Sequence, residues 1–191
     1  RRSLPPQIIK SIGSELVDLH RNTIKRIKEK CVTVGRENGF VLDLHTMAPF
    51  SPKFPSTEVS LAPFNRIKEY VDSFMQVEEA SSVRPIDILV KDENDQQVAD
   101  PHFSKLLFNA FKEAGFQAEF DTPYANHTMY MMNEYLSVAS GAAIDFPKHL
   151  FASGDLIDFK LDSFDLSPCK IENLAVITSM VVTKLFKRTS E

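Results

Sequence analysis

Three groups of polar residues in this sequence have the residue types and the spacing that catalysis or metal binding needs. The first group is Asp43-Leu44-His45, which ends a short apolar run that begins at Phe40. Because side chains alternate along a strand, Asp43 and His45 are expected to point to the same side. A neutral imidazole can bind zinc while a neighbouring carboxylate orients its ring. The group therefore predicts a metal ligand with an orienting partner or, alternatively, a hydrogen-bonded histidine at a strand end.

The second group lies in the segment 121–127, where an apolar run leads into a loop. Tyr124, Asn126 and His127 place a phenol, an amide and an imidazole within four positions, and such groups suit the binding of a polar substrate. The segment is equally typical of a proline-led turn in which Asp121 and Asn126 bond their own backbone. Both interpretations stay open at this point.

The third group is a single carboxylate, Asp145, between Ile144 and Phe146 in an apolar run. Burial beside apolar residues raises the pKa of a carboxyl group, which allows it to act as a general base or acid where water reaches it. The alternative is a structural carboxylate that pairs with Lys148 or with a helix N-terminus.

Amphipathic and apolar runs alternate along the chain, and they must position these groups. Helices are predicted over residues 5–38, 65–77, 101–114, 129–140 and from 168 onward, and strands over residues 40–45, 85–90, 116–121 and 142–146. In the first helix, His20 falls on or beside the apolar stripe, which is typical of a core histidine. Prolines at positions 49, 52, 55 and 63 predict a loop over the site across residues 46–64.

Strands that alternate with helices indicate the α/β class. We expect one domain over residues 1–191, built as a three-layer α/β/α arrangement around a mostly parallel sheet. In an open parallel sheet, ligands bind beyond the carboxyl ends of the strands, and three of the four predicted strands end in polar or ionisable residues. The site is therefore expected at that edge of the sheet.

The composition excludes several classes of function. The 191 residues include 22 Lys and Arg against 26 Asp and Glu, a formal charge of −4, which argues against a general nucleic-acid binder. No run approaches the roughly 18 to 20 apolar residues that span a membrane. The two cysteines, Cys31 and Cys169, are typical of a reducing compartment. We therefore expect a cytoplasmic protein without nucleic-acid or membrane partners.

Several sequence signatures are missing as well. The chain has no glycine-rich phosphate-binding loop and no Gly-x-Ser-x-Gly, which disfavours dinucleotide, nucleoside-triphosphate and serine-hydrolase functions. The chain begins at Arg1 without Met or a signal-like segment, so we expect a processed or truncated piece of a longer protein.

Six short motifs follow one another in order through residues 15–152. They are Leu19-His20, Asp43 to Pro49, Pro85 to Ile88, the predicted helix from Phe103 to Ala114, Thr122-Pro123-Tyr124, and Ile144 to Phe151. In this order they resemble the N-formylglutamate amidohydrolase family, whose members look like distant relatives of the zinc carboxypeptidases and of the succinylglutamate desuccinylase and aspartoacylase group.

The resemblance implies a zinc-dependent amidohydrolase that cleaves the amide of a small N-acyl, N-formyl-like amino acid. It implies that His45 is a zinc ligand and that Asp145 takes the place of the carboxylate that activates the metal-bound water. Asp43 would orient the ring of His45. The residues expected to bind substrate are Thr46, Tyr124, Asn126, His127 and His20.

A second interpretation keeps the fold without the catalysis. In the family, the other two metal ligands, a histidine and an acidic residue, lie on a segment that precedes the region matched here. The general base is Glu in most relatives, where this chain has Asp145. The chain would then be an inactive binding protein that holds an acidic amino-acid derivative, unless a missing N-terminal segment supplies the ligands. A third interpretation makes the helix over residues 5–38 an assembly surface, as in a homo-oligomer.

Overall fold

The computed structural model describes residues 6–49, 83–122, 124–128, 130–153 and 165–188 of the 191-residue chain. Its elements are α1 (Pro6–Arg36), β1 (Val41–Met47), β2 (Ile86–Leu89), α3 (Pro101–Glu113), β3 (Ala118–Phe120), α4 (Met131–Leu136), β4 (Gly141–Pro147), the short 3-10 helix η2 (Lys148–Leu150) and α5 (Pro168–Arg188). The predicted strands are present, and the helix predicted over residues 129–140 is shortened to α4. The helix predicted over residues 65–77 and most of the loop predicted over residues 46–64 lie outside the described residues.

The strands form one sheet in the order β1-β4-β2-β3. β1 pairs with β4 and β2 pairs with β3 in parallel, whereas β2 and β4 are antiparallel. The α/β class and the mostly parallel sheet are confirmed. The prediction that the strands end at one common edge of the sheet is wrong, because β2 and β3 run opposite to β1 and β4 and end at the other edge. Strand and helix order alone did not predict this reversal, since a long connection separates β1 from β2.

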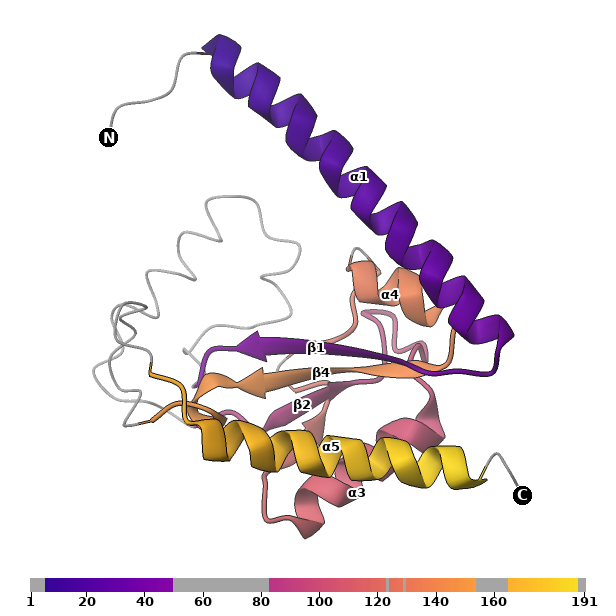
Figure 1. The fold of residues 1–191 in the computed structure, drawn as a ribbon, viewed down its shortest axis with the longest axis vertical. Coiled ribbons are helices and arrows are strands. Elements are labelled where there is room, and N and C mark those ends of the chain that lie inside the picture. Colours follow the sequence, from indigo (N-terminus) through magenta and orange to yellow (C-terminus); the bar gives the residue numbers. More distant parts are fainter. Residues whose placement is uncertain (1–5, 50–82, 123, 129, 154–164, 189–191) are drawn as a thin grey trace.

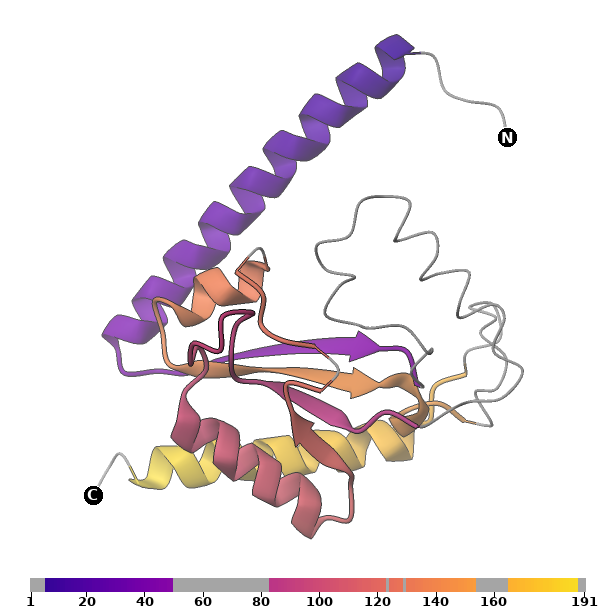
Figure 2. The same cartoon turned by 180° about the vertical axis from the view of Figure 1, so that it is seen from behind.

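Different helices lie on the two faces of the sheet. α3 and α5 run along one face, and α4 lies over the other face together with the C-terminal end of α1 (Figures 1 and 2). Ring contacts join the first face to α3, because Phe111 meets Phe146 of β4 at 5.8 Å between ring centres and Phe108 stacks on Phe120 of β3 at 4.7 Å. The apolar core therefore lies mainly between the sheet and α3.

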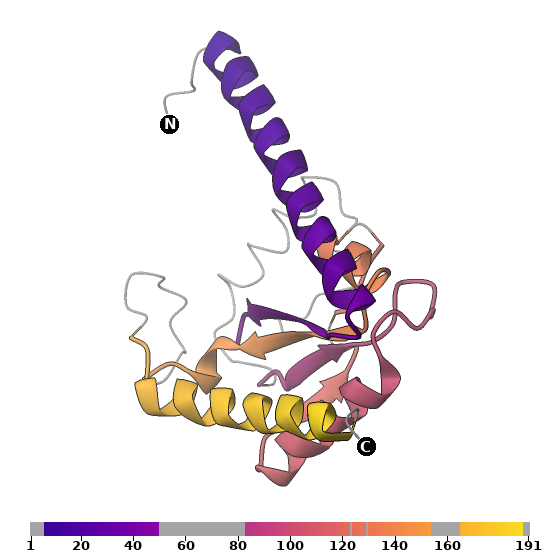
Figure 3. The same cartoon turned by 45° about the vertical axis from the view of Figure 1, so that its right-hand side comes forward.

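Among the described residues, α1 packs against the rest of the protein through its C-terminal part. Cys31 is buried, whereas Leu16 and Leu19 are 58% and 64% exposed. The rest of the helix runs away from the sheet (Figures 1 and 3). The reason is length, because the 31 residues of α1 span about 46 Å while the 7 residues of β1 span about 23 Å. None of the described helices is long and apolar enough to cross a membrane.

Local sequence signals set the ends of the core helices. The Asp100 carboxylate accepts the N–H of Phe103 at 2.8 Å, and Pro101 is the first residue of α3. Gly115 follows α3 with φ +87°, a left-handed conformation that costs glycine little. Both signals were predicted from the sequence, and together they set the two ends of α3.

Candidate functional site

Three polar residues form a row across the middle of the sheet. His45 of β1 is the register partner of Asp145 in β4, and Asp145 is in turn the partner of Asp87 in β2. Register partners on neighbouring strands point to the same face, so these side chains, called the polar row below, lie together on one side of the sheet. The apolar row lies one residue away on the opposite side and consists of Leu44, Ile144 and Ile88.

Asp43 holds the ring of His45. Asp43 Oδ1 lies 3.0 Å from His45 Nε2, which agrees with the expectation that both side chains point to the same side. The other ring nitrogen, Nδ1, is then the one available to a further partner. The imidazole is accessible, since 46% of its side chain is exposed. α4 packs over this side of β1, and there burial, and to a lesser degree Asp43, raises the pKa of the Tyr135 phenol.

Asp145 occupies the centre of the polar row and is 9% exposed. Burial raises the pKa of its carboxyl group, as predicted for a carboxylate in an apolar strand. The His45 imidazole and the Arg84 guanidinium oppose this rise, and Asp43 adds to it. Within the described residues no ion pair joins Asp145 to Lys148. This combination of burial and a raised pKa makes Asp145 a candidate general base.

Asp87 ends the polar row and is completely buried. Each of its carboxylate oxygens accepts one main-chain N–H, from Thr122 at 2.8 Å and from Tyr124 at 2.9 Å. Burial raises the pKa of Asp87 to about 8, while the two N–H groups oppose the rise and the nearby Asp145 adds to it. Asp87 therefore joins the loop after β3 to the face of β2.

A buried cation and a phenol stand beside the polar row. Arg84 is 3% exposed, and its main-chain N–H donates to the carbonyl of Pro49 at 2.9 Å, just beyond the end of β1. Its Nη1 donates to the Tyr124 hydroxyl at 3.0 Å, and its guanidinium lies 5.3 Å from the centre of the Tyr124 ring. Because Arg84 also lowers the pKa of Asp145, positive charge and the candidate base belong to one site.

Asn126 and His127 lie away from the polar row. The main-chain N–H of Asn126 donates to the carbonyl of Lys91, which follows β2 at the other edge of the sheet. His127 Nε2 lies 3.6 Å from Glu93 Oε1 in the same region. Both side chains are buried, at 0% and 5% exposed. Of the three residues predicted in this loop, only Tyr124 is brought next to the polar row.

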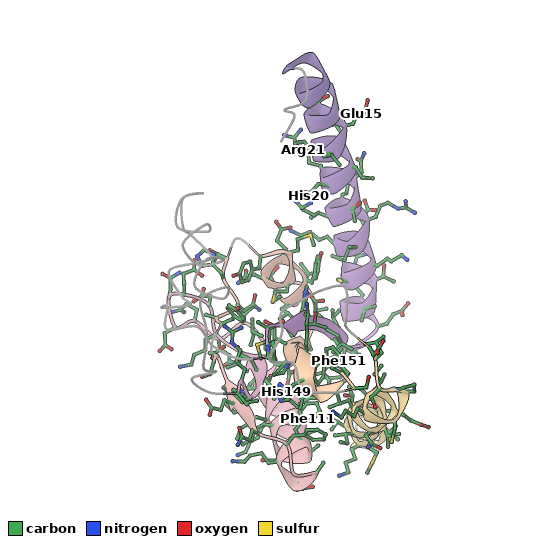
Figure 4. All side chains as sticks on the ribbon, turned by 90° about the vertical axis from the view of Figure 1, so that its left-hand side faces the viewer. Glu15, His20, Arg21, Phe111, His149 and Phe151 are labelled. Carbon is green, nitrogen blue, oxygen red and sulfur yellow. The ribbon has the colours of Figure 1, made fainter. Side chains whose placement is uncertain are left out.

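Two other predicted substrate-binding residues are also placed elsewhere. Thr46 is the register partner of Phe146, whose ring contacts α3, so Thr46 belongs to the face opposite His45. His20 is exposed and lies on the part of α1 that runs away from the sheet, far from His149 at the end of β4 (Figure 4). The prediction of a core histidine at position 20 is wrong, because His20 precedes the part of α1 that packs against the rest of the protein.

Sequence reasoning missed Asp87 and Arg84 as site residues. Asp87 stands between Ile86 and Ile88 in an apolar strand, which is the same signal that identified Asp145. Applied to both strands, that signal predicts two buried carboxylates. Arg84 carries no such signal, because its place in the site depends on the antiparallel direction of β2 and on the phenol that comes from the loop after β3.

The zinc expectation can be tested against these donors. His45 offers an accessible imidazole oriented by a carboxylate, which suits one zinc ligand. Among the residues that the structure describes, however, no three His, Cys, Asp or Glu side chains are placed to hold a metal ion. A catalytic zinc site needs three protein ligands. The described residues therefore fit one ligand of such a site and not the whole set.

Comparisons with known proteins add a likeness of the fold. No protein-family model matches the chain, and no curated protein sequence matches it. Among solved structures, the chain is similar to the N-formylglutamate amidohydrolase from Ralstonia eutropha JMP134, with a TM-score of 0.48 and 10% sequence identity. The match covers 81% of this chain and 45% of that chain. The chain thus spans less than half the length of the protein it resembles.

Proposed function

We propose that this chain forms part of a three-layer α/β/α hydrolase that cleaves the amide of a small N-acyl, N-formyl-like amino acid. The observation that carries the proposal is the polar row. It places an accessible imidazole in register with a buried carboxylate whose pKa is raised. Amide hydrolysis needs a group that takes a proton from the attacking water, and a carboxylate whose pKa is raised takes up a proton more readily than an ordinary one.

Asp145 has the proton-carrying role in this proposal. Its carboxylate accepts a proton from water as the new C–O bond forms at the amide carbonyl. It then gives that proton to the amine nitrogen as the C–N bond breaks, so that a carboxylic acid and a free amine leave. The carboxylate returns to its starting state, and no redox step is involved.

His45 is proposed as a zinc ligand that keeps its ring in place through Asp43. When bound, zinc would polarise the amide carbonyl and lower the pKa of water toward about 7. Because the described residues do not supply three ligands, the remaining ligands would come from outside them. No step above depends on where those ligands lie.

Arg84 and Tyr124 are proposed to recognise the charged end of the substrate. A guanidinium and a phenol hydroxyl are both donors to a carboxylate. Arg84 Nη1 lies 3.0 Å from the Tyr124 hydroxyl, and the guanidinium is near enough to Asp145 to lower the pKa of its carboxyl group. An N-acyl amino acid carries its carboxylate two bonds from the amide nitrogen. This geometry suits a short substrate whose charged end is held while its amide faces the polar row.

A second candidate is a binding protein without turnover. It is favoured by the lack of a three-ligand set among the described residues, since an anion site built on Arg84 and Tyr124 needs no metal. Such a protein would hold an acidic amino-acid derivative and leave its amide intact.

One experiment separates the two candidates. The full-length natural protein and its His45→Ala and Asp145→Asn variants are assayed for zinc by elemental analysis and for release of amine from N-formyl, N-acetyl and N-succinyl amino acids. The hydrolase proposal expects about one zinc per chain in the wild type and in Asp145→Asn, loss of zinc in His45→Ala, and turnover in the wild type alone. Turnover retained in both variants would overturn it. Tight binding without turnover or zinc would support the second candidate.

A further inference from the structure

Two aspartates hold the chain where β3 runs into its loop, and they do so differently. Asp121 accepts the N–H groups of Val90 and Lys91 at 2.8 Å and 3.1 Å, both on its Oδ1 oxygen. Asp87 accepts the N–H groups of Thr122 and Tyr124 on separate oxygens. Both oxygens of Asp87 are therefore committed to one loop, whereas Asp121 uses a single oxygen.

The position of Asp87 is costly for an acidic residue. It is 0% exposed, and within the described residues no ion pair involves it. A buried carboxyl group without partners loses its hydration at a cost in stability, and the hydrogen bonds that offset this loss for Asp87 come from Thr122 and Tyr124. An aliphatic side chain would fill the same place in β2 without that loss. An aliphatic residue would, however, lack the two hydrogen bonds to the main chain of the loop.

The held loop carries a site residue. Tyr124 takes its main-chain position from Asp87, and its hydroxyl meets Arg84 at 3.0 Å. The positive charge of Arg84 in turn lies near enough to Asp145 to stabilise the ionised form of its carboxyl group. We propose that Asp87 is a positioning residue, which fixes Tyr124 against Arg84 and so sets the substrate end of the site beside Asp145. The effect on substrate rests on the proposed function, and the effect on the loop does not.

Asparagine is the sharpest probe of this role. Asn has nearly the volume of Asp but only one acceptor oxygen, so its amide nitrogen would face one of the two main-chain N–H groups. At position 121, Asn keeps Oδ1 for both donors, and it tolerates the positive φ of 51° found there. Asp87→Asn should therefore release the loop, and Asp121→Asn is its matched control.

The first measurement is amide hydrogen exchange on the full-length protein. In Asp87→Asn, peptides spanning residues 121–128 are expected to exchange about tenfold faster than in the wild type, the equivalent of one lost hydrogen bond. In Asp121→Asn the same peptides should stay within about threefold of the wild type. Equal exchange in the two variants would overturn the proposal.

The second measurement is a kinetic cycle on an N-acyl amino acid that the wild type hydrolyses. Asp87→Asn and Tyr124→Phe should each raise KM about tenfold with little change in kcat. The double variant should be no worse than either single variant, because both changes remove the same contact. Additive effects, or a loss confined to kcat, would overturn the role through Tyr124. If the wild type hydrolyses none of the substrates, the proposed function fails and the exchange result alone decides the role of Asp87.

The proposal remains testable if Asp87→Asn does not fold. In the wild-type protein, nuclear magnetic resonance should show the amides of Thr122 and Tyr124 exchanging as slowly as the amides of β2, although they lie in a loop. Exchange at the rate of exposed loop amides would show that Asp87 does not hold them and would overturn the proposal.

Discussion

In each of three strands, a residue of the polar row is next in sequence to a residue of the apolar row. Different interactions nevertheless stabilise the two rows. Ile144 and Ile88 are 0% exposed, and Asp145 and Asp87 are 9% and 0% exposed. Burial is therefore nearly the same on the two faces. What differs is the partner, because Ile144 and Ile88 belong to the apolar core on the side of the sheet where Phe146 meets Phe111 of α3, while Asp87 of the polar row depends on main-chain N–H groups.

This difference shows how one strand contributes to both the core and the candidate site. Because side chains alternate along β4, Ile144 points into the core and Asp145 points to the candidate site while the strand keeps its regular backbone conformation. Dispersion and the hydrophobic effect make the apolar row sensitive to changes in side-chain volume. The polar row depends on hydrogen bonds and charges, so it is expected to respond to changes that preserve shape and remove charge.

Asp145→Asn is expected to have the largest effect. The change preserves shape and removes the group that is proposed to carry the proton, so kcat for amide hydrolysis should fall about a thousandfold, equal to about 4 kcal/mol in the barrier. The melting temperature should not fall, because a buried carboxyl group becomes neutral. Amine release and thermal unfolding check both parts. Asp95→Asn, at an exposed ion pair with Lys91, is the control. Wild-type turnover in Asp145→Asn would remove the polar row from catalysis.

Ile144→Ala tests the other face. Removing most of a completely buried side chain should lower the free energy of unfolding by about 3 kcal/mol, through lost burial and the cavity that remains. Denaturant unfolding measures this value. Val176→Ala on α5, where the side chain is 51% exposed, should cost no more than about 0.5 kcal/mol. Equal costs at the two positions would mean that the apolar row is not the core of the sheet.

The pH dependence of the free energy of unfolding should also distinguish the polar row, which contains a titrating group, from the apolar row, which contains none. The pKa of Asp87 rises from its ordinary 3.8 to about 8 in the folded protein, so the folded state holds a proton that the unfolded state has lost between these values. Stability from this group is therefore complete below about pH 4 and falls by up to about 1.4 kcal/mol per pH unit as the pH rises toward about 8.

In Asp87→Asn this contribution is absent. Its unfolding free energy should decline less steeply over that pH range than that of the wild type, while Ile144→Ala should keep the wild-type slope at lower stability. Denaturant unfolding at a series of pH values makes the comparison. Identical slopes in the wild type and Asp87→Asn would show that Asp87 is ionised in the folded protein throughout this range.

Most of the fold could be predicted from the sequence, because its signals are local. The Asp100-Pro101 start of α3, the apolar run of β4 and the amphipathic pattern of α1 each lie within one segment. The direction of β2 is not local, since it depends on a long connection. The exposure of Leu16 does not follow from a local signal either, because it depends on how far along α1 the packing against the sheet and α4 extends.

The candidate site divides in the same way. Asp43, His45 and Asp145 could be identified from strand alternation and from a charge in an apolar run. The pairing of Arg84 with Tyr124 could not, because it brings together the start of β2 and the loop after β3. Thr46 lies on the opposite face of the sheet from His45, and strand alternation alone already implied this placement.

Asp43→Asn is expected to have the smallest effect and tests how far the polar row extends along β1. The substituted asparagine would keep the size of the side chain but lose the charge that holds the His45 ring, so zinc affinity should fall about tenfold. The free energy of unfolding should change by less than about 1 kcal/mol, because nearly half of the His45 side chain is exposed and such pairs contribute little to stability. Competition with a zinc chelator measures the affinity, and Asp18→Asn, at an exposed pair with Arg21 on α1, is the control. Unchanged affinity in Asp43→Asn would mean that the 3.0 Å contact orients nothing that binds metal, and the functional part of the row would then begin at Asp145.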